Sequence, residues 1–570
     1  MDPQPQTPDP AAWPEVALRP AEHVMRLDRM GSFFASRLSF MRALTRIMAR
    51  ESWQFECPVN ALDEEGYGHM VLRAVAPDAV FSLVIVTEHL EPEERTDRVI
   101  AEKWDASFAL VDGDATNDDI ERLKNNIPYQ EAGRYTAREL VLSRANKSMR
   151  LFHHVVSELA EGRQPELAEL MATGYLMRTT AVYGNGKFGL ADFPKASSHS
   201  ALAGAFRAEM LTVYLIRQFS FLLVNHVAKA KGAERAVDLA PDRCRALGIG
   251  NSTGLGMAPF LIKHPILIHC WVHARETALA RVRAVQRAEP QELEHFSALL
   301  RRAKAHVDQW NVDDDIQMDR ILVLRGELEG LLAEHGAGDL LRAEQPWDHV
   351  YCRVEMDMSL EAQELMVSLL IELYPERVDD LAEQMATSLK EQSEPAKPIG
   401  KLKAVLNTQY EWALSTDFAD PQERHYFWYY SEGKEEPRRG PRFEEFGAGL
   451  EMRLGFGYQV HRLAAELQRW DDETSIAEFL FKRPKWRSTV RRIQTLQHYP
   501  YGEIRDNLLG LSCRPIDLLR CKLSFFGATG FDPRSDLWTR ITMYQGAPLP
   551  DELSDPGSDD WAFPAPPIGR

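Results

Sequence analysis

The spacing of apolar residues changes once along this chain, and that change most constrains its fold. From Trp53 to about residue 111, apolar residues alternate or form short runs between turn-forming residues, as in β-strands. From about residue 118 onward, they recur every three or four positions, as on one face of a helix. We therefore predict an α+β, predominantly α-helical protein, with a small N-terminal antiparallel sheet followed by a large multi-helix domain.

Breaks in this pattern suggest a division of the chain. Residues 391–401 contain two prolines and a glycine, which makes them the best internal boundary. A helix is predicted over Ala21–Arg50, ahead of the strands. The predicted order is a disordered Pro-rich tail (1–20), the N-terminal helix with the small sheet (21–117), a central helical domain with two glycine-rich loops (118–390), the linker (391–401), a C-terminal helical region (402–545) and a Pro/Asp-rich tail (546–570).

Charge and composition narrow the class of protein. The 570 residues include 67 Lys and Arg against 85 Asp and Glu, a net charge of −18, which argues against a nucleic-acid partner. The most apolar stretch, Leu211–Val227, is interrupted by polar residues, so we expect no membrane span. The first twenty residues lack the apolar core of a signal peptide, and the six cysteines form no Cys-x-x-Cys pair. We therefore expect a cytoplasmic protein with reduced thiols.

A first glycine-rich segment, Tyr183–Gly189, matches the letters of the dinucleotide-binding pattern G-x-G-x-x-G. That site requires a helix to begin at the glycines, whereas Pro194 and several serines follow here. We therefore interpret the segment as a loop that contacts an anionic substrate; the alternative is a simple connector. The residues predicted to serve this loop are Arg178, Tyr183, Asn185 and Lys187.

A second glycine-rich segment, Gly248–Gly256, precedes a helix predicted to begin at Pro265. It lacks the Gly-Lys-Ser/Thr ending of a P-loop, and it lacks the strand and helix that would make Ser252 the nucleophile of a G-x-S-x-G elbow. We predict that its backbone and side chains bind a carboxylate or phosphate. The alternative is a helix cap with close packing at the glycines. The predicted contacts are Asn251, Ser252 and Thr253.

His264 lies between this second segment and the helix that follows it. Imidazole titrates near neutral pH, so we interpret His264 as a general acid or base, with Tyr183 and Lys187 as further catalytic candidates. The alternative is a histidine that caps a helix end.

Three further side chains could hold a metal. His269 and His273 lie four residues apart on one helical face, and Glu276 follows three residues later. This spacing suits a divalent metal, although paired histidines also occur in ordinary helix contacts. The sequence declares no other cofactor.

Arg217 lies in an apolar helix, where its charge requires a partner. We predict that Arg217 and Arg178 bind a small anionic ligand; a salt bridge to a carboxylate such as Glu209 is the alternative.

These patterns favour an enzyme that acts on a small carboxylate- or phosphate-bearing substrate by acid–base chemistry, of lyase, isomerase or hydrolase type. One alternative is a non-catalytic helical interaction or ligand-binding protein, such as a homodimer. A second alternative is an oxidoreductase with a flavin or metal that no motif declares. The leading hypothesis requires the two glycine-rich segments to lie close together.

Overall fold

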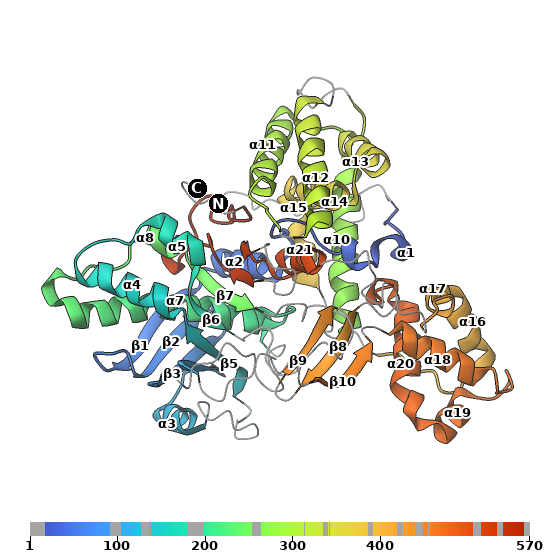
Figure 1. Cartoon of the computed structure of the whole chain (residues 1–570), viewed down its shortest axis with the longest axis horizontal. Coiled ribbons are helices and arrows are strands. Elements are labelled where there is room, and N and C mark those ends of the chain that lie inside the picture. The colour runs from blue at the N-terminus through green and yellow to red at the C-terminus, as the bar shows by residue number, and fades with distance from the viewer. Residues whose placement is uncertain are drawn as a thin grey trace.

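The computed structural model of the chain describes residues 17–91, 104–126, 136, 138–179, 199–252, 264–312, 314–334, 340, 343–385, 391–418, 426–431, 434–439, 448–453, 456–505, 515–532 and 540–563. Within them, a curved sheet occupies one side of the molecule and a stack of helices another, and a smaller group of helices lies beyond a second sheet (Figure 1).

The main sheet has nine strands in the order β1-β2-β3-β4-β5-β6-β7-β12-β11. All neighbouring strands are antiparallel except β6 and β7, which are parallel. The strands are β1 (Gln54–Leu62), β2 (Gly68–Val75), β3 (Val80–Thr87), β4 (Ala106–Asp112), β5 (Glu139–Lys147), β6 (Tyr175–Thr179), β7 (Gly248–Ser252), β11 (Gly530–Asp532) and β12 (Arg540–Met543).

The predicted fold class, α+β with a small N-terminal antiparallel sheet, was therefore wrong. The sheet is large and mixed, and it takes strands from the middle and the C-terminal part of the chain. Its later strands were not predicted from the sequence because they show little alternation of apolar and polar residues. In β7, glycine permits close approach instead: a Cβ on Gly248 would lie 2.3 Å from the carbonyl oxygen of Met543 in β12.

The single helix predicted over Ala21–Arg50 was also wrong. This segment forms α1 (Ala21–Val24), the short 3-10 helix η2 (Leu27–Arg29) and, after an irregular stretch, α2 (Phe40–Arg50). Gly31 lies in that stretch, and a Cβ there would be 2.3 Å from the backbone carbonyl carbon of Arg520. The apolar residues of this region are dense because the segment is buried within the main core, rather than on one side of a long helix.

Helices cover both faces of the main sheet. The long helix α7 (Arg207–Gly232) packs on one face together with α4 (Met149–Ala160), and α3 (Asn117–Asn126) packs on the other (Figure 1). Among the described residues, one helix, Arg207–Arg235, is long and apolar enough to cross a membrane by length and composition alone, and 78% of its most apolar window is buried inside the protein.

The helical stack is built around α10 (Pro265–Arg283), which packs against α13 (Pro346–Asp357), α14 (Leu360–Glu372) and α15 (Pro375–Gln384). This stack shares one continuous hydrophobic core with the α7 face of the sheet. The other elements of the main body are α5 (Leu167–Thr173), α8 (Pro241–Arg245), α11 (Pro290–Val307), α12 (Asp315–Glu334), α21 (Pro515–Phe526), η4 (Ser200–Leu202), η5 (Ala233–Arg235), η11 (Pro500–Gly502) and η12 (Pro550–Glu552).

A second hydrophobic cluster lies within residues 399–493. Its helices are α16 (Ile399–Gln409), α17 (Glu411–Leu414), α18 (Gly457–Leu467), α19 (Ile476–Lys482), η10 (Pro484–Trp486) and α20 (Arg487–His498). A three-stranded antiparallel sheet accompanies them, in the order β10 (Ala448–Arg453), β8 (Tyr426–Ser431) and β9 (Lys434–Arg439). The chain then returns to the main core, where Trp561 and Phe563 near its C-terminal end are buried.

Candidate functional site

The first predicted glycine-rich segment lies outside the described residues, but the strand that precedes it, β6, is a neighbour of β7, which forms the first part of the second segment. The first follows β6 and the second overlaps β7, and these neighbouring strands are parallel, with Arg178 opposite Gly250. Because parallel strands end at the same edge of a sheet, the last residues of the two strands, Thr179 and Ser252, lie at one edge. The Asn251 side-chain amide donates to the carbonyl oxygen of Thr179 over 3.4 Å at this edge. In open α/β sheets, ligands commonly bind outside the carboxyl ends of parallel strands.

One buried oxygen at this edge lacks a donor within the part of the chain that the structure describes. Asn251 is 1% exposed, and its Oδ1 accepts no hydrogen bond from the described residues. Leaving a buried amide oxygen unsatisfied costs about 1–3 kcal/mol, so a donor from a ligand or a water would be favourable here. The neighbouring Thr179 hydroxyl is already fixed, since it lies 2.9 Å from the Ser143 hydroxyl and 3.1 Å from the carbonyl oxygen of Arg144.

Two arginines lie on one face of the sheet near the same edge. Arg178 is opposite Asn146, and Arg144 is two residues from Asn146 along β5, so alternation places both arginine side chains on that face. Arg178 is partly buried, while Arg144 is buried with its guanidinium 4.6 Å from the centre of the Trp104 ring. Burial lowers the pKa of Arg144 to about 10. Both side chains supply positive charge suited to a carboxylate or phosphate.

Several predicted site residues lie outside the described residues: Tyr183, Asn185, Lys187 and Thr253, together with the side chain of Ser252. The backbone of Ser252 is described, and it pairs with Arg540 of β12. His264 occupies the N-cap position of α10 and is partly buried. The roles assigned to these residues stay predictions.

Arg217 lies away from this edge, in the middle of α7. Its guanidinium is fully buried and donates to four backbone carbonyl oxygens, those of Cys244, Leu247, Ala547 and Pro548. These contacts join α7 to the start of β7 and to the C-terminal segment. The four carbonyl dipoles stabilise the buried positive charge, so Arg217 lies outside the site at the ends of β6 and β7.

The geometry gives the metal hypothesis for His269, His273 and Glu276 no support. The two imidazole rings are 5.5 Å apart, but Nδ1 of His269 accepts the backbone N–H of Tyr501 over 3.2 Å. Both carboxylate oxygens of Glu276 accept from arginine, and burial together with His273 lowers the pKa of His269 to about 4. Within the described ranges, no group of three His, Cys, Asp or Glu side chains is arranged to hold a metal.

The sequence analysis missed Lys522. This lysine lies on α21, is 0% exposed, and burial lowers its pKa to about 7. A lysine that titrates near neutral pH can act as a base or nucleophile, although burial alone also produces such a shift. The available signal was a lone lysine inside an apolar helical stretch, Leu518–Phe526.

No family model, curated protein or solved structure matches this chain.

Proposed function

We propose that this chain is an enzyme that binds a small carboxylate- or phosphate-bearing molecule at the edge where β6 and β7 end, and acts on it by acid–base chemistry. The observation that carries the proposal is the parallel pairing of β6 with β7, which brings Thr179, four residues before the first glycine-rich segment, and Ser252, within the second, to one edge of the sheet. At that edge, Arg178 supplies positive charge from one face of the sheet, and Asn251, next to Gly250 on β7, supplies an amide with an unsatisfied oxygen from the other face. The predicted loop residues complete the site in this proposal.

His264 is the proposed acid–base residue because it lies between the second glycine-rich segment and α10, at the N-cap position of that helix. Its imidazole is suited to proton transfer near neutral pH. The rival, a non-catalytic ligand-binding protein, uses the same edge for binding but needs no proton transfer.

Binding is tested first, with inorganic phosphate, pyrophosphate and citrate as probes in thermal unfolding. A probe at about 100 times its Kd stabilises the folded protein by about 2.7 kcal/mol, which is easily measured. Arg178→Gln should weaken the bound probe about tenfold or more, since a hydrogen bond to a charged group contributes about 1.5–3 kcal/mol. Arg163→Gln is the matched control, because Arg163 is exposed and pairs with Glu158 in the turn after α4. If none of the probes stabilises the wild type, or if Arg178→Gln binds as tightly as the control, the proposal is wrong.

Catalysis is tested separately. The wild-type protein is incubated with a mixture of small carboxylates and phosphate esters, and mass spectrometry identifies any compound that is consumed. His264→Ala should abolish consumption while the affinity for the anion probe changes little. Anion binding without any consumed compound would favour the non-catalytic alternative.

A further inference from the structure

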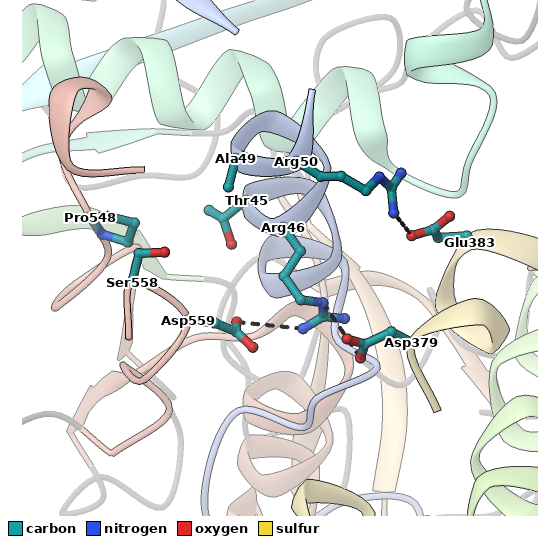
Figure 2. Close-up of a pocket in the computed structure, with 9 residues that line it drawn as sticks. All are labelled: Thr45, Arg46, Ala49, Arg50, Asp379, Glu383, Pro548, Ser558 and Asp559. Carbon is teal, nitrogen blue, oxygen red and sulfur yellow. Dashed lines mark hydrogen bonds and ion pairs between the residues drawn. The ribbon is translucent and has the colours of Figure 1, made fainter. Parts of the chain in front are cut away.

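A pocket of about 270 Å³ with five charged residues in its lining lies between α2, α15 and the C-terminal segment around Pro548 and Asp559. Figure 2 shows Arg46 at its centre, between Asp379 of α15 and Asp559 of the C-terminal segment. Pro548 accepts a hydrogen bond from Arg217, which also bonds to the residue just before β7, so the pocket lies toward the start of β7. It is therefore not the site proposed above, where β7 ends.

Arg46 has an unmet donor in this pocket. Its Nη1 is buried and has no hydrogen-bond acceptor among the described residues. Its Nη1 lies 3.5 Å from Oδ1 of Asp559, and its Nε lies 3.6 Å from Oδ1 of Asp379, both longer than the 2.7–2.9 Å of a good charge-assisted hydrogen bond. Only Nη2 is well satisfied, by the backbone carbonyl of Arg37 at 2.8 Å.

The two neighbouring carboxylates are held by other arginines. Asp379 accepts from Nε and Nη2 of Arg37, each at 2.7 Å. Asp559 lies 3.0 Å from Nη1 of Arg37 and 3.3 Å from Nη2 of Arg42. Moving either carboxylate onto Arg46 would break these shorter contacts, so an acceptor for Nη1 that leaves them intact is a water or a ligand in the pocket.

The charges around the pocket determine which molecule fits. Two cations, Arg46 and Arg50, and three anions, Asp379, Glu383 and Asp559, line it. A simple anion would meet three carboxylates, and a simple cation would meet two guanidinium groups. A molecule that carries both signs can place each charge beside its opposite.

We propose that this pocket binds a small zwitterion of the α-amino acid class. Its carboxylate accepts from Nη1 of Arg46, and its ammonium group faces the carboxylates of Asp379 and Asp559. The cavity is smaller than the roughly 300–1,000 Å³ of typical drug-sized pockets, which suits an amino acid better than a nucleotide. At the exposed side, the ion pair of Arg50 with Glu383 lines the rim (Figure 2). This inference does not rest on the proposed function.

The test uses the full chain with glycine, L-serine, L-aspartate, L-glutamine and L-arginine in thermal unfolding and calorimetry. We expect at least one of them to bind saturably, whereas acetate and methylamine, which each carry one of glycine's charges, do not. Arg46→Gln should weaken the best ligand tenfold or more, and Arg163→Gln should leave it unchanged. Failure of all five amino acids to bind, or equal binding of acetate, overturns the proposal.

A second variant guards against a folding defect in Arg46→Gln. Ala49 lines the pocket without taking part in an ion pair, so Ala49→Leu fills the cavity and should abolish binding. Ala404→Leu, an equal change on an exposed position of α16, is its control and should bind normally. If Ala49→Leu binds as tightly as the wild type, the pocket is not the site. Failure here is distinct from failure of the proposed function: Arg178→Gln affects the anion probes, and Ala49→Leu affects the amino acid.

Discussion

Two ion-pair networks in this protein use the same residue types, and they differ in whether every charge is satisfied. The closed network joins the N-terminal segment to α10 and α14 and consists of Arg19, Arg29, Arg275, Glu276 and Glu364. The open network joins α2 to α14, α15 and the C-terminal segment and consists of Arg37, Arg42, Arg46, Glu372, Asp379 and Asp559.

In the closed network, Arg19 donates to both oxygens of Glu276, at 2.7 and 2.9 Å, and to both oxygens of Glu364, at 2.9 and 3.3 Å. In the open network, Arg46 faces a cavity with a donor unmet. Buried ion pairs offset the cost of desolvation only when their geometry is good and the remaining hydrogen bonds are made. The closed network therefore contributes to the stability of the fold, whereas the open network leaves one arginine donor unsatisfied beside a cavity.

The largest expected effect comes from breaking the closed network. Glu364→Gln removes the carboxylate that pairs with Arg29 and leaves Arg19 with Glu276 as its carboxylate partner, and removing one member of a buried ion pair typically costs about 3–5 kcal/mol. The free energy of unfolding in urea measures this loss. Glu121→Gln, which removes an exposed partner of Lys124, should cost less than about 1 kcal/mol. A similar loss of unfolding free energy in both variants would mean that a buried ion pair of the closed network contributes no more stability than an exposed one.

The same carboxylate should also produce a pH dependence. Burial alone would raise the pKa of Glu364, but Arg19 and Arg275 lower it to about 2, from an ordinary value of 4.5. Between these values the unfolded chain binds more protons, so this contribution is present above pH 4.5 and is lost as pH falls toward 2. It corresponds to about 3 kcal/mol. The stability difference between wild type and Glu364→Gln should shrink on acidification over this range; a constant difference would contradict it.

Lys522 shows what burial does to a charge when desolvation dominates. Burial lowers its pKa from 10.5 to about 7, so the folded protein bears a penalty that is full below pH 7 and disappears as pH rises to 10.5. Lys522→Met should therefore stabilise the protein more at pH 6 than at pH 9, by roughly 2–3 kcal/mol. Urea unfolding at the two pH values measures the difference. A penalty that is equal at both would show that Lys522 keeps its charge when buried.

The smallest expected effect comes from the open network. Asp379→Asn removes a charge that is 31% exposed, and its amide oxygen can still accept from Arg37. Because water in the pocket can solvate Arg46, the expected loss is about 1–2 kcal/mol, less than for Glu364→Gln. Urea unfolding of both variants under one condition makes the comparison direct. If both variants lost the same free energy of unfolding, water in the cavity would not reduce the cost of breaking the open network.

Local patterns in the sequence predicted the first strands well. The strand pattern from Trp53 to about residue 111 corresponds to β1, β2, β3 and β4, because antiparallel neighbours along the chain need only alternation and turns between them. Alternation did not reveal β7 or β12, which are short and pair with distant strands. The parallel pairing of β6 with β7 depends on tertiary structure, and it brings Thr179 and Ser252, 73 positions apart, to one edge of the sheet.

The candidate site shows the same limit. Arg178 and Arg217 looked equivalent in the sequence, since each stood in an apolar stretch near a glycine-rich segment. Only the fold distinguishes them, because it places Arg178 at the edge and surrounds Arg217 with carbonyl oxygens. The ion networks were equally hidden: Arg19 and Glu364 are 345 positions apart, and nothing local marks them as partners.

The placement of β12 beside β7 has a consequence for biosynthesis. The strand that contains Ser252 can pair with β12 only after Arg540 has been translated. The ion pair of Arg42 in α2 forms later still, after Asp559 has been translated. At roughly 5–20 residues per second, a ribosome exposes the unfinished sheet for many seconds. Throughout that interval, the side of β7 that later pairs with β12 has unpaired backbone donors and acceptors, so the far end of the sheet is completed only after residues 540–543 have been made.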